Sequence, residues 1–251
     1  MDINTDAGVM DQHRIQTTSL LLLENRGGEN SDFWYWLKPG QAASKKDANK
    51  FMLAAILDYQ MRAETVWENA RRLSEDILKD PDDLWHAITA VSLDEWQEKR
   101  KEYSLHRFPK GHERVWNIGK RIVQQYEGDV RKIWKEQSIE ATLYRLNDLG
   151  VGEQISRMVV GGLLDTGQIE GKGDVKVDIH VRRVLGRILR GHEFSQQEIG
   201  QVIEITRQMN PDNPWLLDRP LYLLGKQVCQ ASNPECSDCF MNPDCAYFRR
   251  S

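Results

Sequence analysis

The sequence predicts an all-α protein with a metal-binding tail near its C-terminus. Through much of the 251 residues, apolar side chains return at three- and four-residue steps, as they do on one face of a helix. We find no convincing alternation of apolar and polar residues of the kind that marks a β-strand. All four cysteines lie within the last 23 residues, close enough in sequence to surround one metal centre.

The helical pattern can be followed along the chain. It begins strongly over residues 51–73 and breaks at Asp80-Pro81, because proline disfavours a helical residue before it and tolerates a first helical turn after it. Further amphipathic stretches cover residues 83–90, 93–103, 113–126, 129–136, 140–146, 154–164, 179–189 and 196–209. The sequence therefore predicts a succession of short and medium helices that pack around one or two hydrophobic cores.

Composition excludes several classes of protein. The chain has 40% hydrophobic and 29% charged residues and no apolar run of the length that a membrane span needs. Its first 16 residues are polar and acidic, unlike a secretory signal. We expect an intracellular monomer with no membrane partner, cytoplasmic and associated with the nucleoid if the source is prokaryotic.

The net charge of −4 means that any contact with nucleic acid needs a local basic face, and residues 176–190 carry five basic side chains against one acid.

The cysteines Cys229, Cys236, Cys239 and Cys245 are separated by six, two and five residues. Disulfides are disfavoured because disulfide frameworks belong to short secreted domains. Zinc and an iron–sulfur cluster both accept four thiolates, and the Cys236–Cys239 pair is a good zinc knuckle, although zinc ribbons usually have two such pairs. Ligand chemistry alone leaves these two metal centres nearly equal.

A second motif lies between two amphipathic stretches, at Gly150-Val151-Gly152. Glycine accepts the positive φ angles of a tight turn, so a hairpin linking two helices is expected here. The second helix would present backbone N–H groups at its start, and such groups bind a phosphate without reading a base.

From this hairpin to the cysteines, the chain resembles the helix-hairpin-helix DNA glycosylase superfamily, in its endonuclease III-like branch. The family has Leu-Pro-Gly-Val-Gly at the hairpin and Val-Asp-Thr-His before an arginine-bearing helix. The corresponding segments of this chain are Asp148-Leu149-Gly150-Val151-Gly152 and Val177-Asp178-Ile179-His180-Val181-Arg182-Arg183-Val184, with a fainter match at Ile56-Leu57-Asp58-Tyr59-Gln60. The proline is missing, but the glycines, the valine and the Val-Asp-x-His run agree.

The resemblance implies two helical lobes with a DNA-binding groove between them. Residues 50–177 would form the lobe with the hairpin, and residues 1–49 together with 178–251 would form an iron–sulfur lobe. The six-two-five cysteine spacing is similar to the family's [4Fe–4S] loop and favours that cofactor over zinc. The implied partner is double-stranded DNA with a damaged or mismatched base.

The same resemblance implies that Asp178 is the catalytic carboxylate. Cleavage of an N-glycosidic bond builds positive charge on the sugar, which a carboxylate beside C1′ can stabilise while it orients or deprotonates water. Asp178 also precedes a predicted helix, where aspartate is a favoured N-cap. The two roles are compatible.

Gln154 stands where the bifunctional members of the family have a lysine nucleophile. Because an amide cannot form a Schiff base, a monofunctional glycosylase that leaves an abasic site is expected. The alternative is a lyase that uses a displaced lysine, either Lys172 or Lys176, from the loop before Asp178. A further alternative is a DNA-binding lesion sensor without catalysis.

The resemblance also implies a set of DNA contacts. Gln60 would fill the gap that a flipped nucleotide leaves in the duplex. Backbone contacts are expected from the hairpin and from the helix after Asp178, through Gly150, Val151, Gly152, His180, Arg182 and Arg183. The motifs do not decide which base is excised, because pocket shape sets that choice.

Overall fold

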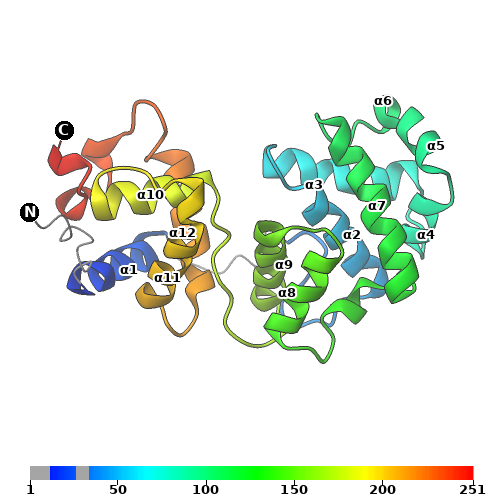
Figure 1. Ribbon diagram of the computed structural model, residues 1–251, viewed down its shortest axis with the longest axis horizontal. Coiled ribbons are helices and arrows are strands. Elements are labelled where there is room, and N and C mark those ends of the chain that lie inside the picture. The colour runs from blue at the N-terminus through cyan, green and yellow to red at the C-terminus, as the bar shows by residue number, and fades with distance from the viewer. Residues whose placement is uncertain (1–11, 27–33, 251) are drawn as a thin grey trace, which may run out of the picture. The chain divides into compact units, whose positions relative to one another are not determined.

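The predicted all-α fold is confirmed. A computed structural model describes residues 12–26 and 34–250, and within these ranges every regular element is a helix (Figure 1). The chain divides into two compact units, one from residues 30–171 and one from residues 1–29 with 172–251. No helix in the described ranges is long and apolar enough to cross a membrane.

The unit of residues 30–171 holds eight α-helices among its described residues, joined by one π-helix and one 3-10 helix. They are α2 (Lys45–Leu57), α3 (Ala63–Arg71), the π-helix η1 (Arg72–Ile77), α4 (Leu84–Thr89), α5 (Leu93–Glu98), α6 (Arg100–Tyr103), α7 (Pro109–Tyr126), the 3-10 helix η2 (Val130–Ile133), α8 (Ile139–Asp148) and α9 (Glu153–Asp165).

Helix α2 is the centre of this unit. Every residue from position 48 to 57 is buried, and α2 contacts α3, α4, α7, α9 and η2. A helix that is apolar on nearly all sides needs neighbours on all sides. Its N-terminus is set by Ser44, whose hydroxyl accepts the amide N–H of Asp47 at 3.0 Å.

The segment before α2 packs into the same unit. Trp34 is 2% exposed and meets Phe51 and Trp67 with ring centroids 5.8 and 5.7 Å apart. Its indole N–H donates to the carboxylate of Asp165 at 2.9 Å. These contacts explain why the described part of this segment belongs with the hairpin unit, whereas residues 172–177 belong with the other unit.

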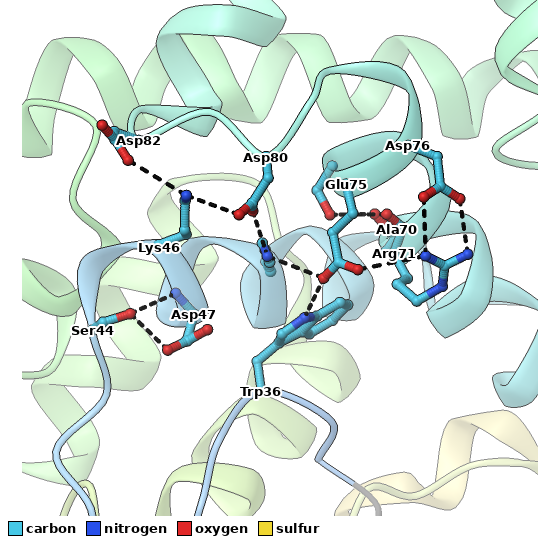
Figure 2. A network of polar contacts seen from close by, with 12 residues as sticks. Trp36, Ser44, Lys46, Asp47, Ala70, Arg71, Glu75, Asp76, Asp80 and Asp82 are labelled. Atoms are coloured by element: carbon cyan, nitrogen blue, oxygen red, sulfur yellow. Dashed lines mark hydrogen bonds and ion pairs between the residues drawn. The ribbon is translucent and has the colours of Figure 1, made fainter.

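A charged network braces one side of α2. The ammonium of Lys50, a side chain only 8% exposed, lies 3.0 Å from Glu75 and 2.6 Å from Asp80. Figure 2 shows Lys46 bonded to Asp80 and Asp82, and Glu75 accepting the indole N–H of Trp36. Hydrogen bonds from Lys50 and Lys46 hold the pKa of the Asp80 carboxyl below its ordinary value.

We expect Lys50→Met to lower the free energy of unfolding by about 1–3 kcal/mol at pH 7, less than for a fully buried pair because both carboxylates are partly exposed. A carboxyl with a lowered folded-state pKa stabilises the fold above its unfolded pKa, about 3.9 for aspartate. That contribution disappears as pH falls through the folded-state pKa. Urea unfolding at several pH values should therefore show a weaker loss of stability below pH ~4 in the variant.

The exposed Lys38→Met removes the same charge outside the network and serves as the control. A stability of Lys50→Met equal to that of this control at every pH would contradict the role given to the network.

In the part of the chain that the structure describes, the other unit packs four α-helices around one core. They are α1 (Gln12–Arg26), α10 (Ile179–Arg190), α11 (Ile199–Met209) and α12 (Asp218–Gln227). Short 3-10 turns complete the unit at η3 (Gln196–Glu198), η4 (Pro214–Leu217), η5 (Cys236–Asp238), η6 (Asn242–Asp244) and η7 (Phe248–Arg250). Helices α10 and α12 lie side by side (Figure 1), and Val181, Val184, Leu221 and Leu224 belong to the shared core.

Two elements differ from the sequence prediction for local reasons. The helix expected over residues 129–136 is only η2, because the Asp129 carboxylate accepts the amide N–H of Arg131 and Glu136 adopts a left-handed φ of 58° that ends any helix. Helix α7 begins earlier than expected, at Pro109, since proline fits the first helical position.

Candidate functional site

The Gly150-Val151-Gly152 segment forms the expected hairpin between α8 and α9. Gly150 and Gly152 have φ angles of 88° and 80°, a conformation that would strain any residue with a β-carbon. The amide N–H groups of Gly150 and Val151 are bonded inside the hairpin, to the carbonyl oxygens of Asn147 and Leu146. Val151 is fully buried and anchors the turn.

The next two amides are different. Within the described ranges, the N–H groups of Gly152 and Glu153 donate to no acceptor, and both residues are exposed. They stand at the N-terminus of α9, a helix of 13 residues, where the aligned peptide dipoles favour an anion. This arrangement can bind a phosphate oxygen. Gln154 is the next residue of α9 and is half-buried.

Asp178 is the N-cap of α10. Its Oδ1 accepts the amide N–H groups of His180 and Val181 at 2.7 and 3.0 Å, and its own N–H donates to the carbonyl of Lys176 at 2.8 Å. The side chain is half-buried, and Oδ2 accepts no hydrogen bond from the described residues. The carboxylate is thus fixed through one oxygen and leaves the other for an external group.

Two of the three contact residues predicted on the same helix, His180 and Arg182, are held by neighbours. The His180 ring packs edge-on against Tyr222, with centroids 5.3 Å apart, and its Nδ1 accepts from Arg183 at 3.0 Å. Arg182 is half-buried and donates to the carbonyl of Phe194 at 2.9 Å.

Arg183 requires a correction. It was expected to contact DNA, but it is 3% exposed and its guanidinium donates to the carbonyls of Cys229 and Gly225, both at 2.8 Å. One turn later Arg187, also buried, donates to the carbonyls of Gln230 and Ala231 at 2.6 and 3.0 Å. Two arginines on the buried face of α10 therefore hold the start of the cysteine loop, and the basic count of this segment overstates its exposed charge.

The four cysteines line one cavity, together with apolar side chains from α10, α12 and the loop. All four are free thiols, so the disulfide alternative has no support. Burial is the main cause that raises the pKa of Cys229, Cys236 and Cys239. The Arg187 guanidinium lies 3.7 Å from Sγ of Cys229 and over the Tyr247 ring.

The donor set of this site bears on its ligand. Among the residues that the structure describes, no three His, Cys, Asp or Glu side chains lie close enough to hold a single metal ion. The four thiols instead line a small cavity of about 20 Å³ that is partly open to solvent. Four sulfur donors around one apolar cavity are a ligand set that an iron–sulfur cluster or zinc can accept.

Gln60 lies in the turn between α2 and α3, exposed and with a left-handed φ of 50°. The preceding Tyr59 stacks on His106, with ring centroids 4.3 Å apart. Nε2 of His106 lies 3.0 Å from the Tyr59 carbonyl, and Nδ1 accepts the N–H of Phe108 at 3.1 Å. The turn that carries Gln60 is therefore rigidly supported, by residues that sequence reasoning missed because nothing in the helical pattern marks them.

The two candidate lyase lysines have different surroundings. Lys172 is exposed, and its ammonium donates to the carbonyl of Pro211 at 2.9 Å and lies 3.8 Å from Asp212. Lys176 is half-buried, and its backbone N–H donates to the Asp218 carboxylate at 2.8 Å. In sequence and by the Asp178–Lys176 backbone bond, Lys176 is the nearer of the two to the catalytic candidate.

Comparisons with known proteins agree with these features. No family model matches the chain. The chain is 22% identical to "Endonuclease III" of Thermotoga maritima over 205 aligned residues. The alignment covers 81% of this chain and 85% of that protein. Two solved structures, a trapped endonuclease III–DNA covalent intermediate and a non-covalent endonuclease III–DNA complex, each give a TM-score of 0.65 at 16% and 18% identity, covering 96% of this chain and 99% and 98% of theirs. A thermostable thymine-DNA glycosylase gives 0.63 at 17% identity, covering 95% of this chain and 98% of its own.

The fold and the hairpin thus define a protein of the endonuclease III fold class. Within that class, the comparisons confirm the resemblance to the helix-hairpin-helix DNA glycosylases of the endonuclease III-like branch that the motifs predict.

Proposed function

We propose that this protein is a DNA glycosylase that removes a damaged or mismatched base from double-stranded DNA, with Asp178 as its catalytic carboxylate. The observation that carries the proposal is the fixed Asp178 side chain, whose Oδ1 caps α10 and whose Oδ2 is left for substrate. Positive charge develops on the deoxyribose as the base departs, and a carboxylate oxygen stabilises it without any reorganisation. The same oxygen can accept a proton from the attacking water.

In this proposal the hairpin binds the DNA backbone. The N–H groups of Gly152 and Glu153 would bind one backbone phosphate at the start of α9, which sets the register without reading sequence. Gln60, exposed on its supported turn, would enter the stack when the target nucleotide leaves it.

The four cysteines would hold a [4Fe–4S] cluster, a fit supported by the shared cavity and the sulfur donor set. When bound, the cluster would join four points of the loop of residues 229–245 through metal–sulfur bonds and so fix its conformation. Arg183 and Arg187 hold the same loop from α10.

We further propose that the enzyme is monofunctional, because Gln154 occupies the place of the lysine nucleophile, and that it acts as a monomer. A panel of lesion-bearing duplexes, incubated with and without later alkali, tests both the activity and its type. Strand breaks that appear only after alkali mean base removal without a lyase. Absence of base release from every duplex, although the protein binds DNA, would favour a lesion sensor.

Borohydride trapping distinguishes the lyase alternative, since a Schiff base between a lysine and C1′ is reduced to a stable adduct. We expect no adduct with the natural chain and an adduct with Gln154→Lys. Trapping by the natural chain that is lost in Lys176→Gln or in Lys172→Gln would identify the displaced nucleophile and overturn the monofunctional assignment.

A further inference from the structure

Arg114, on α7, lies directly beside the hairpin. Its Nη2 donates to the carbonyl oxygens of Gly150 and Val151, the former at 3.4 Å. A β-carbon placed on Gly152 would lie 3.8 Å from that Nη2. Arg114 forms no ion pair with a carboxylate among the described residues, and burial lowers the pKa of its guanidinium. A cation without a counter-ion therefore lies against the hairpin, on the carbonyl oxygens of Gly150 and Val151.

The charge is not isolated. Lys110, Arg114, Asn117 and Arg121 recur at three- and four-residue steps on one face of α7, so they share a stripe. They line a surface groove of about 400 Å³ that reaches Leu149 and Gly150. Acids are also near it, because Glu113 lines the groove and Asp148 lies 3.4 Å from Arg121. Arg114 is thus the cation in this groove that is both beside the hairpin and free of an acidic partner.

The other face of Arg114 reaches the Gln60 turn. Its guanidinium carbon lies 5.2 Å from the centre of the Tyr59 ring, a cation–π contact. Tyr59 stacks in turn on His106, which bonds the carbonyl of Tyr59, the residue just before Gln60. The Arg114 side chain therefore contacts both the hairpin and Tyr59, the residue just before Gln60.

We propose that Arg114 binds the DNA backbone beside the phosphate that the hairpin amides hold and, as a positioning residue, links the docking of the backbone to the placement of Gln60. This rests on the proposed function, because it assumes that the hairpin binds DNA. A neutral donor would suffice to brace two carbonyl oxygens. The unpaired charge at the groove is explained by an anionic ligand, and a DNA backbone docked on the hairpin supplies phosphates beside it.

Binding to a duplex with a tetrahydrofuran abasic analogue, followed over a range of salt concentrations, measures the phosphate contact. A 2-aminopurine beside the analogue reports local unstacking by its fluorescence. For Arg114→Gln we expect affinity to fall about ten- to a hundredfold and the slope of log K against log salt to become shallower by about 0.9. Lys120→Gln, the same charge change elsewhere on α7, should leave both unchanged.

Two further variants separate the two contacts of Arg114. Arg114→Lys keeps the charge but loses the guanidinium that lies over the Tyr59 ring, so it should restore the salt slope and leave the fluorescence change reduced. Tyr59→Leu should keep the natural slope and also reduce the fluorescence change, and it tests the link even if Arg114→Gln fails to fold.

An unchanged slope in a folded Arg114→Gln would overturn the phosphate contact. A full fluorescence change in both Arg114→Lys and Tyr59→Leu would overturn the link to Gln60. If the natural chain does not bind the duplex at all, the proposed function fails. If the natural chain binds, but the Arg114 and Tyr59 variants bind and respond as Lys120→Gln does, this inference alone fails.

Discussion

Asp178→Asn should slow base release by at least about 100-fold while leaving the fold intact. Removing one preorganised electrostatic contact to a developing charge typically costs about 10²–10³ in rate, and this substitution also removes the acceptor for the proton of water. Asparagine caps helices as well as aspartate does, and its side-chain oxygen can still accept the N–H groups of His180 and Val181. Catalysis and stability should therefore separate at this residue.

The measurement is a single-turnover rate on the duplex that the natural chain processes best, together with urea unfolding. We expect the unfolding free energy to change by less than about 0.5 kcal/mol. Asp178→Ala is the matched comparison, since it should lose both the rate and about 1 kcal/mol of helix capping. Base release by a folded Asp178→Asn at the natural rate would remove Asp178 from the mechanism.

Cys236→Ser should lose the metal centre and destabilise the unit that contains the loop. The segment from Cys229 to Arg250 contains only single-turn 3-10 helices, so its fold depends on anchors: the core residue Met241, the bonds from Arg183 and Arg187, and whatever the thiols bind. Four-ligand structural metal sites contribute about 10–16 kcal/mol of apparent binding free energy in small domains. We expect at least about 3 kcal/mol to be lost here when one ligand is removed.

Iron and zinc analysis of the purified protein, its visible absorption and its urea unfolding curve together test this expectation. Ser237→Ala changes an exposed residue between two candidate ligands and should keep iron, colour and stability. Zinc without iron in the natural chain would overturn the cluster assignment. Full stability of Cys236→Ser would show that the protein part of the loop holds itself.

Much of this site was visible in the sequence because local rules fix it. The hairpin follows from two glycines, since φ angles of 88° and 80° are open to glycine at little cost. The capping of α10 by Asp178 follows from one side chain and two amides that are close neighbours in the chain. The helical pattern of residues 179–189 follows from its spacing, and α10 spans Ile179–Arg190.

What the sequence by itself determined was therefore the helical class, the hairpin, the cap and the clustering of thiols, all set by interactions within a few residues. Only the tertiary structure decided that Arg183 and Arg187 face inward onto the cysteine loop, more than 40 residues away, and not toward a ligand. It alone brought Arg114 between the hairpin and Tyr59, which are separated from it by 36 and 55 positions. The direction in which a charged side chain points depends on which distant backbone carbonyls lie within its reach, and no local pattern encodes that.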